Sequence, residues 1–138
     1  MFLLDTCVVS EGNKLQLDRA VDAWFAAQRQ SELYFSAISV GELKYGVARL
    51  SDGRKKTELQ RWLDETVVVG FAGRVLDFDQ ASALRWGALR AEYPSAKTVD
   101  AQIAATALTF DMTLVTRNIK DFGFRGLAVL NPWKAVGV

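Results

Sequence analysis

Four acidic side chains and one asparagine stand where a parallel α/β protein would bring them together. Each follows a short apolar segment or opens a stretch with helical spacing, and the five are Asp5, Glu42, Asp100, Asn118 and Asp121. In open α/β sheets, ligands bind at the carboxyl ends of the strands, where the following helices begin. We therefore expect these side chains to gather at one edge of a sheet.

Several carboxylates at one edge repel one another unless a cation lies between them. Such clusters hold the metal ions of phosphodiester-cleaving sites, where the metal polarises the phosphate and activates a water. The chain contains no histidine, which excludes Ser-His and Cys-His nucleophiles and imidazole acid–base chemistry. Zinc is disfavoured for the same reason, whereas Mg²⁺ or Mn²⁺ suits oxygen ligands. We expect Asp5 and Asp100 to be the direct metal ligands.

Each acidic residue also has a plain structural explanation. Asp5 can cap a following turn or helix with help from Thr6. Ser39-x-x-Glu42 has the form of a capping box, which would occupy Glu42 at a helix start. Asp121 can be a surface charge. The argument for a site therefore rests on the set, since capping by chance would not place all these residues on one edge.

Asp100 carries a further signal. Ile103, Ala104 and Ala107 follow it at helical spacing, so Asp100 shares the apolar face of its helix. A carboxylate that points inward has to be compensated, and a metal ion is one such partner.

The composition fits one domain over residues 1–138. Half of the residues are hydrophobic, and the formal net charge is only +1. There is no broad basic field of the kind that attracts nucleic acid, so an RNA contact requires a local patch. The basic residues that flank the acidic segments are candidates, although each can be ordinary surface charge: Lys44, Arg49, Arg117 and Lys120.

The single cysteine, Cys7, excludes an intramolecular disulfide. It lies in an apolar stretch, where a small buried hydrophobe is a better explanation than a nucleophile. We expect a reducing, cytoplasmic setting, with no membrane span and no signal peptide.

The apolar pattern predicts alternating strands and helices. We expect strands near residues 2–4, 33–37, 75–78, 112–116 and 127–130, and helices near 17–27, 40–50, 57–66, 79–92 and 98–110. Asp18 and Asp79 are the expected caps of the helices at 17–27 and 79–92. Ala81, Leu84, Ala88 and Leu89 are the predicted buried stripe of the helix at 79–92. Residues 8–17 read as a connection of undefined form, and 67–69 as a helix end or a strand. Alternation with helix-length crossovers predicts a three-layer α/β/α sandwich with a parallel sheet of four or five strands.

Four motifs, in this order, resemble those of PIN-domain ribonucleases, and more narrowly of VapC-type toxins from toxin–antitoxin pairs. They are Leu-Leu-Asp-Thr at 3–6, Ser-x-x-Glu-Leu at 39–43, Asp-Ala-x-Ile-Ala-Ala-Thr-Ala at 100–107, and Thr-Arg-Asn-x-x-Asp-Phe at 116–122. The resemblance implies a magnesium-dependent endoribonuclease, usually dimeric and inhibited by a VapB-type antitoxin.

The resemblance also assigns roles by position. Asp5, Glu42 and Asp100 match the acidic site. Many PIN domains carry an aspartate where this chain has Asn118, so Asp121 is the candidate for the missing charge. Thr6 is expected to orient Asp5 or a metal-bound water, with Thr116 in a supporting role.

Two other classes of function are open to the sequence. A phosphate-accepting receiver or haloacid-dehalogenase-like domain would need a second acid close to Asp5, and Cys7 occupies the position that the latter requires. A non-catalytic PIN-like module that binds RNA or a peptide is the stronger alternative, because Asn118 departs from the acidic pattern.

Overall fold

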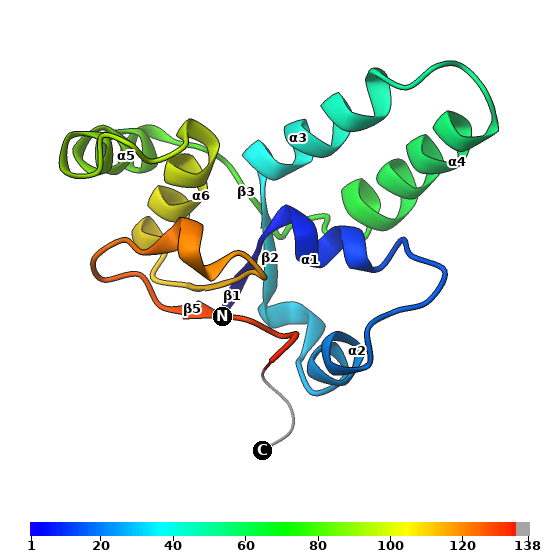
Figure 1. The fold of residues 1–138 in the computed structure, drawn as a ribbon, viewed down its shortest axis with the longest axis horizontal. Coiled ribbons are helices and arrows are strands. Elements are labelled where there is room, and N and C mark those ends of the chain that lie inside the picture. Colours follow the sequence, from blue (N-terminus) through cyan, green and yellow to red (C-terminus); the bar gives the residue numbers. More distant parts are fainter. Residues whose placement is uncertain (135–138) are drawn as a thin grey trace.

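A parallel five-stranded sheet forms the centre of the computed structural model, which describes residues 1–134 (Figure 1). The strand order is β3-β2-β1-β4-β5, and every neighbouring pair is parallel. The strands are β1 (Phe2–Leu4), β2 (Leu33–Ser36), β3 (Val75–Leu76), β4 (Thr113–Val115) and β5 (Val129–Leu130). This arrangement confirms the predicted fold class, with the first strand of the chain in the middle of the sheet.

The connections between strands are mostly helical. The helices are α1 (Thr6–Glu11), α2 (Arg19–Ala26), η1 (Gln30–Glu32), α3 (Ala37–Ala48), α4 (Arg54–Trp62), the π-helix η2 (Leu63–Val69), α5 (Gln80–Glu92), α6 (Thr98–Thr109) and η3 (Ile119–Phe122). Asp18 caps α2 and Asp79 caps α5 through their side chains, as the sequence predicts. No helix within residues 1–134 is long and apolar enough to cross a bilayer.

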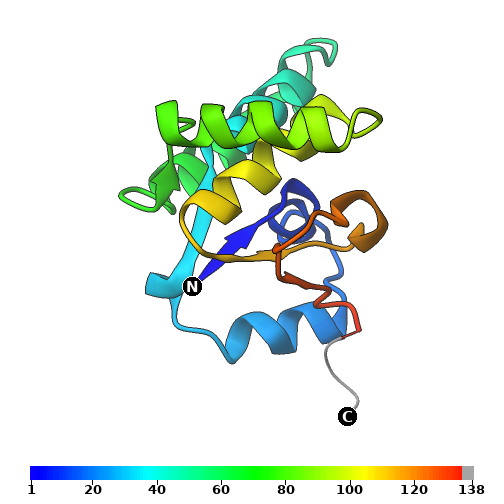
Figure 2. The same cartoon turned by 90° about the vertical axis from the view of Figure 1, so that its left-hand side faces the viewer.

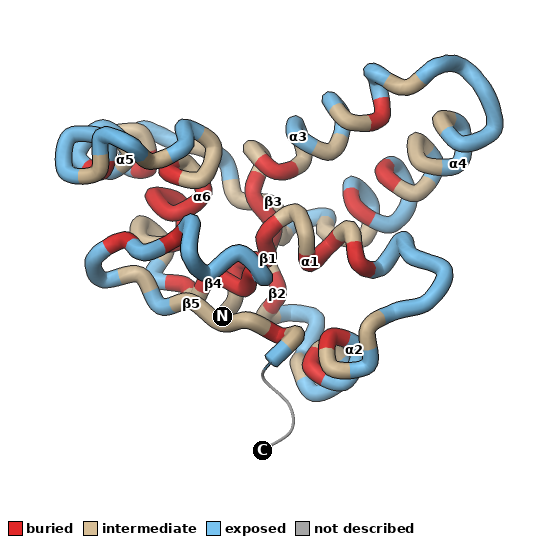
Figure 3. Tube along the Cα trace, viewed as in Figure 1, coloured by how far each residue is buried: buried red, intermediate tan, exposed pale blue. Residues whose placement is uncertain are grey.

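Successive residues of β1 point to opposite faces of the sheet, as the pleat requires. Leu3 belongs to the core beneath α6, and Leu4 to the core beneath α1 and α2. Figures 1 and 2 show these helices on opposite sides of the sheet, and Figure 3 shows that the buried residues concentrate along the strands and α6. Both faces are covered, which explains why most residues of the strands are apolar.

Two helix starts differ from the sequence prediction. The predicted connection at residues 8–17 begins inside a helix, because α1 starts at Thr6 directly after β1 and ends at Glu11. The capping box at Ser39 is also wrong: α3 begins at Ala37, and Ser36 is its cap, with its Oγ accepting from the N–H of Ile38 at 3.1 Å. Ser36 ends the strand and starts the helix without an intervening loop, so the helix begins earlier than the later serine suggests.

The inward face of α5 also differs from the prediction. Leu89 is buried as expected, but Ala81, Leu84 and Ala88 are exposed. The buried face carries Ser82 and the half-buried Trp86, whose ring packs edge-on against Phe78 at 5.9 Å. The large indole sets the inner face of the helix, which turns the alanine and leucine stripe outward.

The segment at 67–69 is the end of a helix. Here α4 continues into the π-helix η2, in which Leu63 and Val67 are buried. Gly70 follows, and a Cβ at this position would lie 2.0 Å from the carbonyl oxygen of Thr66. Only glycine fits at the end of this wider turn.

Candidate functional site

Asp5 lies at the carboxyl end of the central strand, and its carboxylate is held from two sides. Its Oδ1 accepts from the backbone N–H of Thr6 at 2.8 Å, which caps α1. Its Oδ2 accepts from the hydroxyl of Thr116 at 2.7 Å, at the end of the neighbouring strand β4. Only 7% of Asp5 is exposed. Asp5 therefore both caps α1 and lies at the edge of the sheet. Thr6 takes part in the cap through its backbone N–H.

Asp100 lies in the first turn of α6, on the same edge of the sheet. It is half-buried, and Ile103, Ala104 and Ala107 on its face are buried, as the helical spacing predicts. Its pKa is raised above the ordinary value, first by burial and then by the negative charges of Asp121 and Asp5. Asp121 and Asp5 are thus close enough to disfavour the charge of Asp100, which is the property expected of a cation site.

The segment after β4 forms one 3₁₀ turn. The N–H of Asn118 donates to the hydroxyl of Thr116 at 3.1 Å, and the N–H of Asp121 donates to the carbonyl of Asn118 at 3.0 Å. Asn118 precedes this turn with φ −94° and ψ 58°, and Asp121 lies inside it. Asp121 lines a hollow together with Asp100.

Glu42 takes a different position. It is exposed in the second turn of α3, not the first, and lines a hollow with Ser10 and Asn13 beside α1. Asp100 and Asp121 line another hollow, and the charges of Asp121 and Asp5 raise the pKa of Asp100.

The donor set suits a hard cation that keeps part of its water shell. Within residues 1–134, no three Asp, Glu, Cys or His side chains stand close enough to enclose an ion. Mg²⁺ commonly binds through one or two carboxylates plus waters and substrate phosphates, so a closed protein cage is not required. The raised pKa of Asp100, beside the charges of Asp121 and Asp5, fits the presence of such an ion.

The basic candidates are dispersed. Lys44 donates to Gln60 at 2.6 Å, and Arg49 stacks on Tyr45, both along α3. Arg117 stacks on the ring of Trp133, with 4.9 Å from its guanidinium carbon to the ring centroid. Lys120 alone of the four lines the hollow that contains Asp100 and Asp121.

Two neighbours of the site carried no clear signal in the sequence. Lys97 precedes α6 and lines the same hollow as Asp100, and its charge lowers the pKa of that carboxyl. Its spacing of three residues before Asp100 is the one clue. Cys7 places its Sγ 3.6 Å from Oδ2 of Asp5 and 3.7 Å from Oγ1 of Thr116. Burial raises the pKa of this thiol, which agrees with the prediction that it is not a nucleophile.

Comparisons with known proteins agree with this arrangement. The PIN domain family matches residues 2–127. A VapC ribonuclease of Sinorhizobium fredii is 40% identical over 138 residues, which cover 97% of this chain and 99% of the relative. Toxin FitB of Neisseria gonorrhoeae is 39% identical over 140 residues, covering 96% of this chain and 99% of FitB.

Solved structures show the same similarity in three dimensions. A chain in the structure of FitAB bound to a DNA fragment has a TM-score of 0.89 at 36% identity and covers 99% of both chains. A chain of FitAcB from Neisseria gonorrhoeae has a TM-score of 0.87 at 38% identity and covers 97% of this chain and 99% of that one. The order of the motifs, the sheet topology and these similarities lead to one conclusion: this chain belongs to the PIN domain family and is a relative of the VapC and FitB toxins.

Proposed function

We propose that the protein is a VapC-like toxin that hydrolyses phosphodiester bonds of RNA with the help of Mg²⁺, for which Mn²⁺ can substitute. The observation that carries the proposal is the place of Asp100 at the carboxyl edge of the sheet, where burial and then the charges of Asp121 and Asp5 raise the pKa of its carboxyl. The ribonuclease named among its relatives supports RNA as the substrate.

Asp5 and Asp100 would hold the ion, and Asp121 would reach it through a water. Thr116 and the N–H of Thr6 fix the orientation of the Asp5 carboxylate by their hydrogen bonds. When bound, the metal polarises the phosphate and lowers the pKa of a water. We retain Glu42 as a site residue that acts from the α3 side of the edge, where it would contact the substrate or a metal-bound water.

The test is Asp100→Asn. This change removes a charge and keeps the side-chain shape, so Mg²⁺-dependent cleavage of RNA should be lost while the far-UV CD spectrum stays the same. Asp64→Asn is the matched control, because Asp64 is exposed on η2 and contacts only the Gln60 amide among the described hydrogen bonds. Unchanged cleavage by Asp100→Asn would refute the assignment.

The non-catalytic alternative is favoured by Asn118, which stands where many PIN domains have an acid. Incubation of the wild-type protein with RNA and Mn²⁺ distinguishes the two functions. A nuclease binds Mn²⁺ and degrades RNA, whereas a binding module retains RNA without shortening it. Full-length RNA recovered after incubation with excess Mn²⁺ would favour the module.

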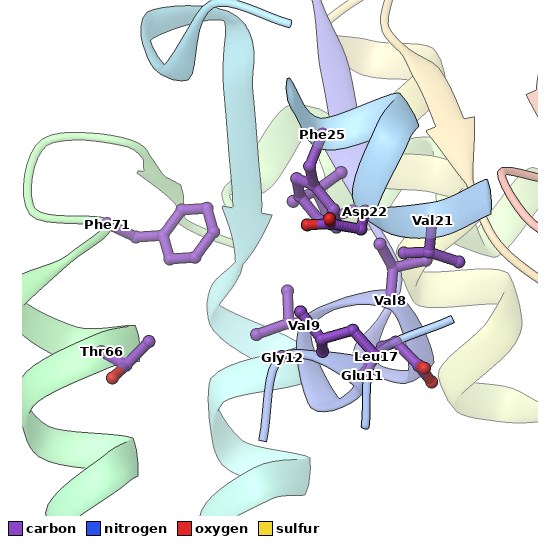
Figure 4. A pocket seen from close by; sticks show the side chains of 11 residues that line it. Val8, Val9, Glu11, Gly12, Leu17, Val21, Asp22, Phe25, Thr66 and Phe71 are labelled. Atoms are coloured by element: carbon purple, nitrogen blue, oxygen red, sulfur yellow. The ribbon is translucent and has the colours of Figure 1, made fainter. Parts of the chain in front are cut away.

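The partner that we propose is a VapB-type antitoxin. A toxin–antitoxin complex from Klebsiella pneumoniae contains a chain with a TM-score of 0.70 at 25% identity. In this protein, an apolar hollow of about 260 Å³ lies between α1, α2 and η2, and Figure 4 shows Val8, Val9, Phe25 and Phe71 around it. Phe25, Thr66 and Phe71 also line the adjoining hollow of about 290 Å³. We name these two adjoining hollows the groove and propose that it binds an amphipathic segment of the antitoxin.

A variant inside the groove tests this partner. Phe71→Ala removes a ring shared by both hollows, so a co-expressed VapB-type antitoxin should be co-purified less well. Phe78→Ala is a control with the same chemistry on the other side of the sheet, where the ring packs on Trp86. Equal recovery with both variants would exclude the groove.

We further propose that the protein forms a homodimer. Leu84 on α5 is 70% exposed and Tyr45 on α3 is 64% exposed, and Ala81 and Ala88 extend the exposed stripe around Leu84. Exposed apolar surface of this kind is typical of association sites. Leu84→Glu should halve the mass measured by light scattering. A wild-type protein that is monomeric at high concentration would contradict the dimer.

A further inference from the structure

One hollow beside the acidic residues has a volume of about 400 Å³ and lies between the α5–α6 connection and η3. Its lining includes Tyr93, Lys97, Asp100, Lys120, Asp121 and Phe124. The volume lies within the range of small-ligand sites in proteins and is sufficient for one nucleotide. The hollow therefore includes Asp100, one of the two proposed metal ligands, and is large enough for one residue of a substrate strand.

The charges that line this hollow are of both signs. Asp100 and Asp121 supply the negative side, and the ammonium groups of Lys97 and Lys120 supply the positive side. Both lysines are exposed, and in the chain up to residue 134 neither forms an ion pair within 4.0 Å. Once a metal neutralises the carboxylates, two cationic groups remain for an anion. A phosphate is the anion that a nucleotide strand would bring to them.

The walls of the hollow are tied together before any ligand arrives. The N–H of Arg125 donates to the hydroxyl of Tyr93 at 2.9 Å, which joins the α5–α6 connection to the segment after η3. The rings of Tyr93 and Phe124 meet edge-on at 5.1 Å, and Arg125 pairs with Glu92 at 2.8 Å. A site whose walls are already fixed loses less conformational entropy when a ligand binds.

We propose that this hollow is a subsite for the nucleotide next to the scissile bond, on one side only, and that Lys97 and Lys120 bind the outer phosphate of that nucleotide. The inference rests on the proposed function, since it requires that RNA reach Asp100. It adds a residue, Lys97, that the basic candidates from the sequence did not include. It also makes the two sides of the scissile bond unequal. The phosphate on the side of this hollow is recognised by charge, and the phosphate on the opposite side of the scissile bond is not.

The test uses short RNA substrates in which each phosphate in turn is replaced by a neutral methylphosphonate. For the wild-type protein, one position next to the scissile phosphate should reduce kcat/KM by about tenfold or more, the size expected for a charge-assisted hydrogen bond. In the double variant Lys97→Gln/Lys120→Gln, the same replacement should cost less than about twofold, because its partners are already absent. Lys55→Gln, an exposed change on α4, should keep the wild-type pattern.

The outcomes separate the two proposals. If the wild-type protein cleaves RNA and the double variant shows the same methylphosphonate pattern, the subsite is wrong and the nuclease stands. If no RNA is cleaved by the wild-type protein with Mg²⁺ or Mn²⁺, both proposals are overturned. Thermal melting of the double variant checks its fold. The single variants then apportion the effect, since Lys97 precedes α6 without a side-chain cap and can be replaced without loss of capping.

Discussion

The hydroxyl of Thr116 donates a 2.7 Å hydrogen bond to Oδ2 of Asp5, and this contact joins the ends of strands β4 and β1. The same hydroxyl accepts the N–H of Asn118 at 3.1 Å. One side chain therefore fixes the carboxylate of the central strand and also the start of the turn that carries Asp121. The two acidic parts of the site share this single threonine.

Replacing Thr116 by valine keeps the shape and removes the hydrogen bonds. Because Thr116 is fully buried, we expect a loss of about 1–3 kcal/mol in the free energy of unfolding, together with slower RNA cleavage. Urea denaturation and kcat measure the two effects. Thr116→Ser retains the hydroxyl and should recover most of the cleavage rate. A valine variant as active as the wild type would show that the orientation of Asp5 does not depend on this bond.

The raised pKa of Asp100 predicts how stability depends on pH. The folded protein keeps a proton on this carboxyl to a higher pH than the unfolded chain does, because burial and then the charges of Asp121 and Asp5 disfavour ionisation. The penalty is absent below the ordinary carboxyl pKa and grows as the pH rises through the folded value. Without metal, Asp100→Asn should thus be more stable than the wild type at neutral pH. The difference should disappear toward acid pH, as thermal melting in the presence of a chelator can measure.

Mg²⁺ should reverse this difference. The ion binds the wild-type carboxylates and raises the melting temperature by mass action, whereas Asp100→Asn should respond weakly. An equal response of the two proteins would mean that Asp100 is not a ligand.

The number of bound metals is a separate prediction. With Asn118 in place of a fourth acid, the free protein should bind one ion, and a second should arrive only with the RNA phosphate. Asn118→Asp should create a second site in the free protein, and Asp121→Ala should weaken Mn²⁺ binding and slow cleavage less than Asp100→Asn does. Calorimetry with Mn²⁺ counts the sites. Two tight sites in the unaltered protein would contradict the one-metal argument.

Glu11 has a structural role that predicts an effect on the loop after α1. Only 3% of Glu11 is exposed, and its carboxylate pairs with Lys14 at 2.8 Å and accepts the N–H of Asp18 at 2.9 Å. The pair with Lys14, followed by the Asp18 contact, lowers the pKa of Glu11, so this stabilisation is present at neutral pH and is lost as the pH falls through the lowered value. Glu11→Ala should speed hydrogen exchange at the Asp18 amide. Lys14→Ala, which leaves that amide bonded, should have a smaller effect.

Much of the fold follows from short patterns in the sequence. The apolar runs at β1 and β4 predict buried parallel strands, and the caps at Asp18 and Asp79 are correct because a short polar side chain before a helical stripe has few other uses. Where two polar residues compete, the sequence alone does not decide. Ser36 and Ser39 both precede the stripe of α3, and the strand end selects the first.

The site was predictable in part, for a similar reason. Asp100 is identified by the apolar residues on its own helix face, a local signal that the structure confirms. The place of Glu42 in the second turn of α3, beside α1, depends on where α3 starts and how it packs, which no local spacing encodes. The predicted buried stripe on α5 is wrong although its spacing is regular. The bulky ring of Trp86 packs inward on Phe78, and most of the alanine and leucine residues of the stripe face outward.

The central place of the first strand has a consequence for synthesis. Asp5 precedes its partner Thr116 by 111 positions in the chain. Strand β1 lies between β2 and β4 in the sheet, so its edge toward β4 has no partner until β4 has been synthesised. The carboxylate of Asp5 therefore receives its orienting hydroxyl only after β4 has been synthesised, and a chain interrupted before β4 carries the aspartate without this contact.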